Sequence, residues 1–195
     1  MNAFDTDIVL WLNGLSGNVQ FIDDLLRVLS SDYLMPLLFS TAVVAVWFAG
    51  RTSLERSRYQ VAALVGMSSI GFSNLAVFGI NSVWDRPRPY VALGEDINLL
   101  FYRATDPSFP ANPVAIGFAA AAALWPVSRQ LAIWLAVGSL AYGFSRVYAG
   151  VFYPTDIFGG AAVGVLVVWG TLRLRDLLEP VVTLFIRVVR GFSLA

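Results

Sequence analysis

Four charged side chains near the ends of apolar segments are the residues of this chain best suited to chemistry. Arg86 and Arg88 follow one apolar segment, Arg146 lies near the end of another, and Asp156 lies in the first turn of the last one. An arginine beside a membrane span usually faces the bundle interior or a watery cavity. Guanidinium groups that meet helix N-termini, such as the one starting at Asn112, bind anionic oxygen clusters. These residues therefore predict a site for phosphate.

The same residues also have a purely structural interpretation. Arg86 and Arg88 would then be interfacial anchors, and Arg146 and Asp156 would pair with each other across adjacent helices. Structural ion pairs of this kind are common. Asp156 would also complement the positive N-terminus of its own helix. Both interpretations remain open at the level of the sequence.

The composition excludes several kinds of chemistry. The chain has 195 residues, of which 57% are hydrophobic and 13% charged, whereas charged residues make up roughly a quarter of a soluble domain. The mean hydropathy of +0.69 favours an integral membrane protein. His, Cys and Lys are all absent, which removes thiol, imidazole and amine chemistry and most transition-metal ligands. A net charge of zero argues against nucleic acid, and we expect no metal or cofactor.

The pattern of apolar segments predicts a single all-α membrane domain over residues 1–195. Its core, 33–175, is a bundle of five to six transmembrane helices. Residues 4–31 are interrupted by acids and predict one or two interfacial helices, broken near Gly17 and Asn18. Residues 177–194 predict a basic amphipathic helix, with a sixth span as the alternative. The five predicted spans are 33–50, 59–83, 113–127, 129–149 and 154–172.

Charge differs between the two sides that five spans define. One side carries eight arginines and three acids, and the other carries five arginines and ten acids. The positive-inside rule places the arginine-rich side in the cytoplasm. The polar stretches around residues 85–90, 109–113 and 152–156 then all face outward from a bacterial or archaeal plasma membrane. Three distant segments should therefore meet at one membrane face.

Three stretches at that face carry recognisable spacing. They are NSVWDRPRP at 81–89, FPANP at 109–113 and SRVYAGVFYPTD at 145–156. Their order and spacing resemble the three motifs of the type 2 phosphatidic acid phosphatases, relatives of the vanadium haloperoxidases. Those motifs are Lys, six residues, Arg-Pro; then Pro-Ser-Gly-His or Pro-Ser-Asn-His; then Ser-Arg, five residues, His, three residues, Asp. The resemblance covers about residues 30–175.

The chain departs from this pattern at several chemical positions. Asn81 stands where the family has Lys, and Ala111 and Pro113 replace the Ser and His of the second motif. Phe152 replaces the His of the third. In active members, as the resemblance implies, that third-motif His attacks phosphorus and the second-motif His protonates the leaving alcohol. This chain would therefore be a degenerate member that lacks both catalytic histidines.

The resemblance also implies what remains of the site. Arg88 and Arg146 match the arginines that hold phosphate, and Asp156 matches the acid that orients the lost His. We predict a catalytically inactive protein with no catalytic residues, in which Arg86, Arg88, Arg146, Asn112 and Asp156 bind a lipid phosphate or polyprenyl phosphate. Transport between leaflets, sensing and presentation to a partner all fit this site.

Two other hypotheses remain. One is an active lipid phosphatase or phosphotransferase that works through Asp156 or a bound water. The other is a structural subunit, with a partner membrane protein or a second copy of the chain, in which the charges only stabilise the bundle.

Overall fold

The computed structural model describes residues 3–177 together with residues 184, 186 and 188. Residues 3–177 contain eight α-helices and one short 3-10 helix. The predicted helix at 177–194 lies almost entirely outside the described residues. The elements are α1 (Ala3–Asn13), α2 (Gln20–Leu29), α3 (Leu34–Trp47), α4 (Ser53–Asn81), α5 (Pro89–Ala92), η1 (Gly94–Asp96), α6 (Asn112–Leu124), α7 (Arg129–Tyr148) and α8 (Pro154–Leu177).

Local sequence signals mark the starts of the long helices. Thr52 and Glu55 form a capping box at the start of α4. The Thr52 hydroxyl accepts from the Glu55 N–H, and the Glu55 carboxylate accepts from the Thr52 N–H. The Ser128 hydroxyl accepts from the Leu131 N–H at the start of α7. Prolines occupy the first turns of α6 and α8, where a missing N–H costs little.

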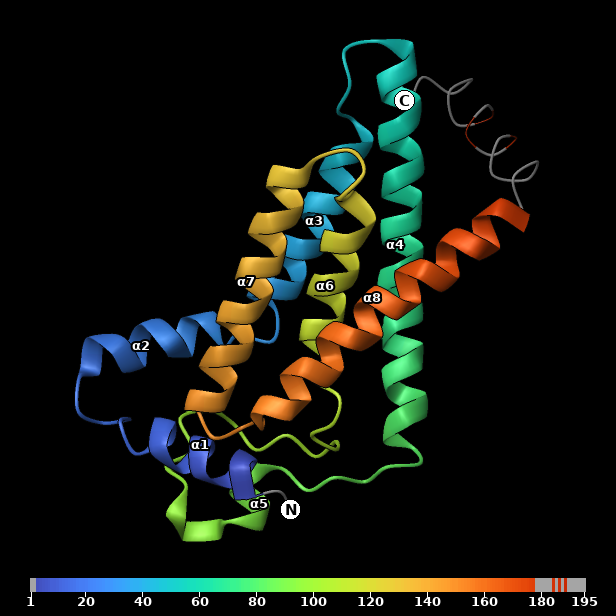
Figure 1. Ribbon diagram of the computed structural model, residues 1–195. Coiled ribbons are helices and arrows are strands. Elements are labelled where there is room, and N and C mark those ends of the chain that lie inside the picture. The colour runs from blue at the N-terminus through green and yellow to red at the C-terminus, as the bar shows by residue number, and fades with distance from the viewer. Residues whose placement is uncertain (1–2, 178–183, 185, 187, 189–195) are drawn as a thin grey trace.

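The bundle is built around α6. Helices α3, α4, α7 and α8 all pack against it, and α8 crosses α6 and α4 obliquely (Figure 1). The alanines of α6 are mostly buried, so its neighbours approach its backbone closely. The small side chains of α6 thus allow close helix packing inside the bundle.

The crossing of α8 over α6 depends on two glycines. A Cβ on Gly160 would lie 2.4 Å from the carbonyl oxygen of Ala111, and a Cβ on Gly164 would lie 2.3 Å from that of Ala115. Real side chains do not fit at such distances, so both positions require glycine. The Gly160-x-x-x-Gly164 pattern therefore holds the start of α8, and with it Asp156, against the start of α6.

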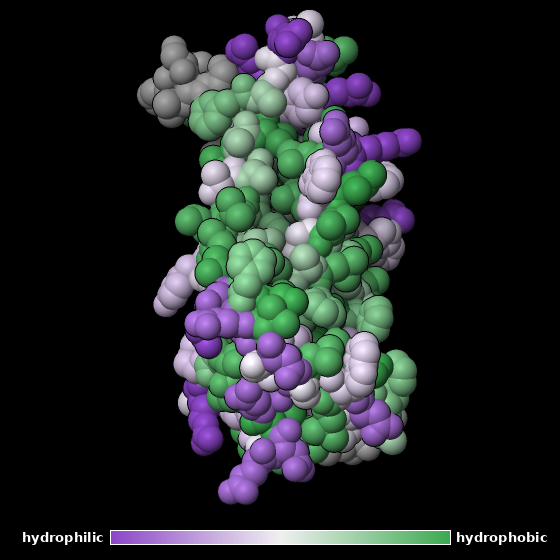
Figure 2. All heavy atoms as spheres, turned by 90° about the vertical axis from the view of Figure 1, so that its left-hand side faces the viewer, coloured by the Kyte–Doolittle hydropathy of each residue, from purple (hydrophilic) through white to green (hydrophobic). Residues whose placement is uncertain are grey.

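The surface of the molecule is that of an integral membrane protein. A hydrophobic band separates two hydrophilic ends (Figure 2). Within the described residues, α4, α7 and α8 are long and apolar enough to cross a membrane, and α2 with α3 forms a fourth candidate bent by 46°. Helix α6 is apolar but has only 13 residues. The observed bundle thus supplies three to four candidate spans, and the count of five to six stays a prediction.

The N-terminal region contains two helices, α1 and α2, as the sequence allowed. The break between them includes Gly17, whose φ of 86° is in the left-handed region that favours glycine. Phe21, Leu25 and Val28 of α2 are exposed, which is typical of a helix that contacts lipid. The pairing of α2 with α3 as a bent span is a second possibility that the sequence did not suggest.

Candidate functional site

The three motif segments meet at one end of the bundle. This end, at the bottom of Figure 1, also carries α1 and α5. The Ser108 N–H donates to the carbonyl of Arg86 at 2.9 Å, which joins the first two segments. The Ala111 N–H donates to the carbonyl of Asp156 at 3.0 Å, which joins the second and third. The predicted convergence of these segments is confirmed.

The turn between α7 and α8 places the third motif. Gly150 has a φ of 75°, and a Cβ there would lie 2.4 Å from the Ile97 side chain. The Val151 N–H donates back to the carbonyl of Arg146 at 2.9 Å. Phe152 and Tyr153 follow and are buried, Phe152 with only 4% of its surface exposed. An aromatic side chain at position 152 is thus buried in the core.

Arg86 lies at the centre of a closed network of charges. Its Nη1 is 2.6 Å from Asp156 Oδ1 and 2.8 Å from the Thr155 hydroxyl, and its Nη2 is 2.7 Å from Asp5 Oδ2. The guanidinium also stacks on Tyr153, 4.3 Å from the ring centroid. The predicted site residues Arg86 and Asp156 are therefore brought together as a structural ion pair.

Both carboxylates of this network are fully engaged. Asp156 is 0% exposed, and its second oxygen accepts from the Tyr153 N–H at 2.7 Å. Asp5 is 1% exposed and accepts from both the N–H and the hydroxyl of Thr155. Burial raises the pKa of Asp5, but the hydrogen bonds from Thr155 and Arg86 and the charge of Arg86 together lower it below its ordinary value of 3.8. The network thus ties α1 to the start of α8.

Arg88 makes a different set of contacts, with Asp106, Val151 and Phe152. Its Nε donates to the carbonyl of Asp106 at 2.8 Å, and its Nη2 is 2.9 Å from the Asp106 carboxylate. Its Nη1 approaches the carbonyl of Val151 at 3.4 Å. The guanidinium lies over Phe152, 4.6 Å from the ring centroid. Arg88 itself is buried, whereas 61% of the Asp106 side chain is exposed.

Arg146 pairs with the N-terminal half of the chain. Its Nη2 contacts the carboxylate of Asp32, which also accepts from the Tyr102 hydroxyl. That hydrogen bond is the main reason why the pKa of Tyr102 is raised to about 12, with burial adding to it. Arg146 also stacks on Phe101, 4.3 Å from its centroid. Its Nε is buried and has no hydrogen-bond partner among the described residues.

One predicted contact differs from that observed. Arg146 and Asp156 do not pair with each other, because Asp32 and Arg86 are their respective partners. The amide nitrogen of Asn112, another predicted site residue, donates to Asn74 Oδ1 on α4 at 2.8 Å.

The partner carboxylates were missed as site residues. They are Asp5, Asp32 and Asp106, and all of them lie on the acid-rich side of the sequence. That side carries ten acids and only five arginines, and this surplus of acids is the sequence signal that could have indicated these partners. Buried arginines need counter-charges, so some of those acids had to be their partners.

A cavity of about 480 Å³ opens beside Arg86. Trp84, Phe109 and Tyr153 line its apolar part, and Asp5 and Asp85 line its polar part with Arg86. Two carboxylates against one guanidinium leave this cavity with a formal charge of −1, which disfavours an anion. Among the described residues, no group of three or more His, Cys, Asp or Glu side chains is arranged to hold a metal ion.

Comparison with known proteins places the chain in one family. The model of the PAP2 superfamily matches residues 62–179, more than half of the chain, and the chain belongs to that superfamily. It is 28% identical over 177 residues to undecaprenyl-diphosphatase BcrC of Bacillus subtilis (strain 168), covering 91% of this chain and 87% of the relative. It is also 26% identical over 168 residues to the bacitracin transport permease protein BcrC of Bacillus licheniformis, covering 85% and 77%.

Two solved structures share the fold. LpxE of Aquifex aeolicus superposes with a TM-score of 0.68 at 24% identity, covering 88% of this chain and 96% of that one. A PAP2-type phosphatidylglycerolphosphate phosphatase of Bacillus subtilis superposes with a TM-score of 0.65 at 18% identity, covering 89% and 85%. The chain is thus an integral membrane protein of the PAP2 superfamily with bacterial relatives.

Proposed function

We propose that this chain binds a polyprenyl or other lipid phosphate without hydrolysing it. The single observation that carries this proposal is the burial of Phe152 against Arg88, in a chain that has no histidine. The resemblance to the phosphatases assigns the nucleophile to position 152. A phenyl ring has no lone pair, so it cannot attack phosphorus.

The expected loss of activity is large. Removing a nucleophile reduces turnover by about 10⁶-fold in other covalent enzymes. Pro113, at the position of the general acid, cannot donate a proton, and general acid assistance contributes about 10²–10⁴-fold. No other imidazole is present to take over either role.

The geometry of Asp156 opposes the alternative of an aspartate nucleophile. Its side chain is 0% exposed, one oxygen is 2.6 Å from Arg86 and the other accepts from the Tyr153 N–H. An attacking carboxylate needs a free lone pair in line with the phosphorus atom. Asp156 would have to break the buried network around Arg86 to provide one.

Binding is assigned to Arg88 and Arg146, because their counter-ions are replaceable. The Asp106 side chain is 61% exposed and that of Asp32 is 29% exposed. Such carboxylates can rotate into water when a phosphate offers more oxygen acceptors to the same guanidinium. Arg146 also has an unused Nε donor. Arg86 and Asp156, by contrast, serve to hold the site together, and Asn112 supports it through α4.

The choice of ligand rests on family membership and on membrane topology. One relative is named an undecaprenyl-diphosphatase, so undecaprenyl phosphate and undecaprenyl diphosphate are the first ligands to test. With five spans, as the sequence predicts, the positive-inside rule places the motif-bearing end at the outer face of the plasma membrane. A carrier or a sensor of lipid phosphates would both need binding without hydrolysis.

The binding proposal is tested by measuring the Kd of undecaprenyl phosphate for the purified protein in detergent. Replacement of Arg88 or Arg146 by Gln should weaken binding by about tenfold or more, since a hydrogen bond to a charged group contributes roughly 1.5–3 kcal/mol. Arg27→Gln is the matched control, because Arg27 lies at the same end in an exposed pair with Asp24. It should leave the Kd within about twofold of the wild-type value.

The same experiment distinguishes the structural-subunit hypothesis from the binding proposal. The pairing of each of the three arginines with one of the chain's own carboxylates is the observation that favours it. It requires that no lipid phosphate binds, or that Arg88→Gln and Arg146→Gln bind as well as wild type. Either result would overturn the binding proposal.

A further inference from the structure

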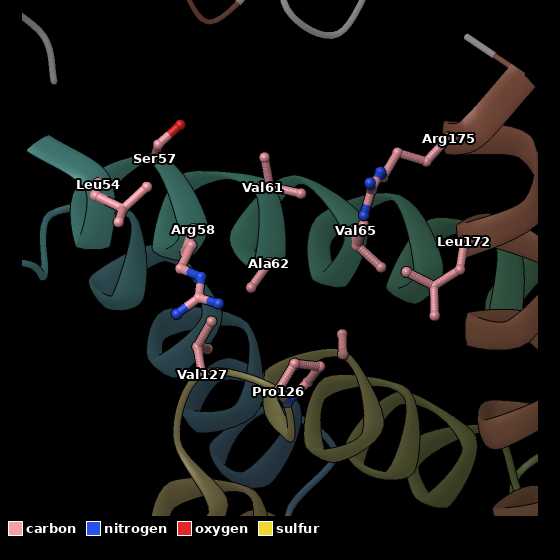
Figure 3. Close-up of a pocket in the computed structure, with 11 residues that line it drawn as sticks. Leu54, Ser57, Arg58, Val61, Ala62, Val65, Pro126, Val127, Leu172 and Arg175 are labelled. Atoms are coloured by element: carbon pink, nitrogen blue, oxygen red, sulfur yellow. The ribbon is translucent and has the colours of Figure 1, made fainter. Parts of the chain in front are cut away.

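A second cavity lies at the opposite end of the bundle, far from the motif segments. It has a volume of about 350 Å³ and lies between α4, the turn from α6 to α7, and α8 (Figure 3). This is the arginine-rich end, which contains the turn between α3 and α4. The phosphatase motifs contribute no residue to its lining.

Two arginines from different helices reach into this cavity. Arg58 of α4 points toward Val127, and the side chain of Arg175 extends from α8 toward Val65 (Figure 3). Arg58 is exposed and forms no salt bridge within the described part of the chain. Among the described residues, the salt-bridge partner of Arg175 is Asp176, at 3.4 Å, whose own side chain is 63% exposed. Within the described part of the chain, neither arginine is paired with a buried carboxylate, unlike Arg86 at the motif end.

Apart from Ser57, the rest of the cavity wall is apolar. Val61 and Val65 of α4, Val127 of the turn and Leu172 of α8 form most of it. Cationic groups beside an apolar wall match a ligand with an anionic head and a hydrocarbon tail. The cavity lies at the arginine-rich end of α4 and α8, two of the candidate spans, where such a ligand lies in a bilayer. A water-soluble anion would gain nothing from the apolar wall.

We propose that this cavity binds an anionic phospholipid of the leaflet at the arginine-rich end. The phosphate accepts hydrogen bonds from Arg58 and Arg175, and the first part of an acyl chain covers Val61, Val65 and Leu172. Guanidinium groups bind phosphate oxygens with two parallel hydrogen bonds each. The lipid thereby links α8 to α4 at the end where the two helices separate (Figure 1).

The test uses the full chain in detergent and native mass spectrometry with added phosphatidylglycerol or phosphatidylcholine. Wild-type protein should retain phosphatidylglycerol in preference to phosphatidylcholine. Arg58→Gln combined with Arg175→Gln should weaken phosphatidylglycerol binding by about tenfold or more. Arg173→Gln is the matched control: Arg173 is exposed on the same turn of α8 but stacks on Trp169, outside the cavity. It should leave binding within about twofold of wild type.

A second variant keeps both charges and fills the cavity. Val61→Trp should also lose the preference for phosphatidylglycerol, because the tail can no longer enter. The proposal is overturned if Arg173→Gln weakens binding as much as the double variant, if Val61→Trp binds normally, or if wild type does not distinguish the two lipids. An adduct with the mass of a polypeptide, or of a second copy of the chain, in place of a lipid would overturn it as well.

Discussion

The network around Arg86 and the pair formed by Arg88 and Asp106 lie at the same end of the bundle but differ in exposure. Both carboxylates of the Arg86 network, Asp5 and Asp156, are at most 1% exposed. Asp106, in contrast, has 61% of its side chain in contact with solvent. In the first network both carboxylates are buried, whereas the second arginine has a partner that can leave.

This difference separates the arginine to which we assign a structural role from those to which we assign phosphate binding. A fully desolvated pair is stabilising only while both members are present, because a lone buried charge costs several kcal/mol. A pair with one exposed member loses little when that member returns to water. Exposure of the partner, and not burial of the arginine, therefore indicates which guanidinium is free to take a phosphate.

The largest expected effect is on the closed network. Asp156→Ala should lower the free energy of unfolding by about 3–5 kcal/mol, because it leaves Arg86 with an incomplete set of acceptors in a buried site. Unfolding of the purified protein in mixed micelles, followed by circular dichroism, measures this change. A change below about 1 kcal/mol would show that the network is not structural.

The second effect depends on pH. The pKa of Asp5 is lowered in the folded protein, so its stabilisation is present above its ordinary value of 3.8 and is lost as the pH falls through the folded pKa. Asp5→Asn should therefore have a lower Tm than wild type at pH 7, and this difference should shrink as the pH falls below 3.8. Melting curves from pH 7 to pH 3 check the prediction. A difference in Tm that does not change with pH would contradict it.

A smaller effect is expected at the open pair. Asp106→Asn should change the free energy of unfolding by no more than about 1 kcal/mol, because the exposed carboxylate contributes little. It should also tighten binding of undecaprenyl phosphate, since the Asp106 carboxylate no longer competes with the phosphate for Arg88. Unfolding and binding measurements on the same preparation test both parts. Weaker binding in this variant would mean that Asp106 holds Arg88 in its binding position.

The smallest effect serves as the reference for the other three. Arg27 and Asp24 form a pair in which more than half of each side chain is exposed. Asp24→Asn should alter neither the Tm nor lipid binding beyond experimental error, since exposed pairs of this kind contribute roughly 0–1 kcal/mol. A measurable loss would mean that α2 contributes to the site through its charges.

Much of the bundle could be predicted from the sequence, because helix boundaries have local signals. The predicted spans at 129–149 and 113–127 match α7 and α6 to within a few residues, since Ser128 and Pro113 mark their starts. The convergence of the motif segments followed from the alternation of spans. The bend between α2 and α3 has no comparable local signal and was not predicted.

The ionic partners could not be predicted in the same way. Pairing Arg146 with Asp156 was reasonable from adjacent helices, but Arg146 pairs with Asp32, 114 positions earlier in the chain. Which acid meets which arginine depends on how α1 and the loops fold over the bundle end. Such contacts are set by tertiary packing, and spacing along the chain does not encode them.

Phosphate release by the purified protein is the most direct test of the central claim, that binding is retained and hydrolysis is lost. Undecaprenyl diphosphate and phosphatidic acid would be offered in detergent, with the undecaprenyl-diphosphatase BcrC of Bacillus subtilis as the active control. The account predicts release no higher than that of buffer alone, from protein that binds undecaprenyl phosphate in the same preparation. Release above that background, lost in Asp156→Asn, would contradict it and would mean that the chain hydrolyses lipid phosphates without histidine.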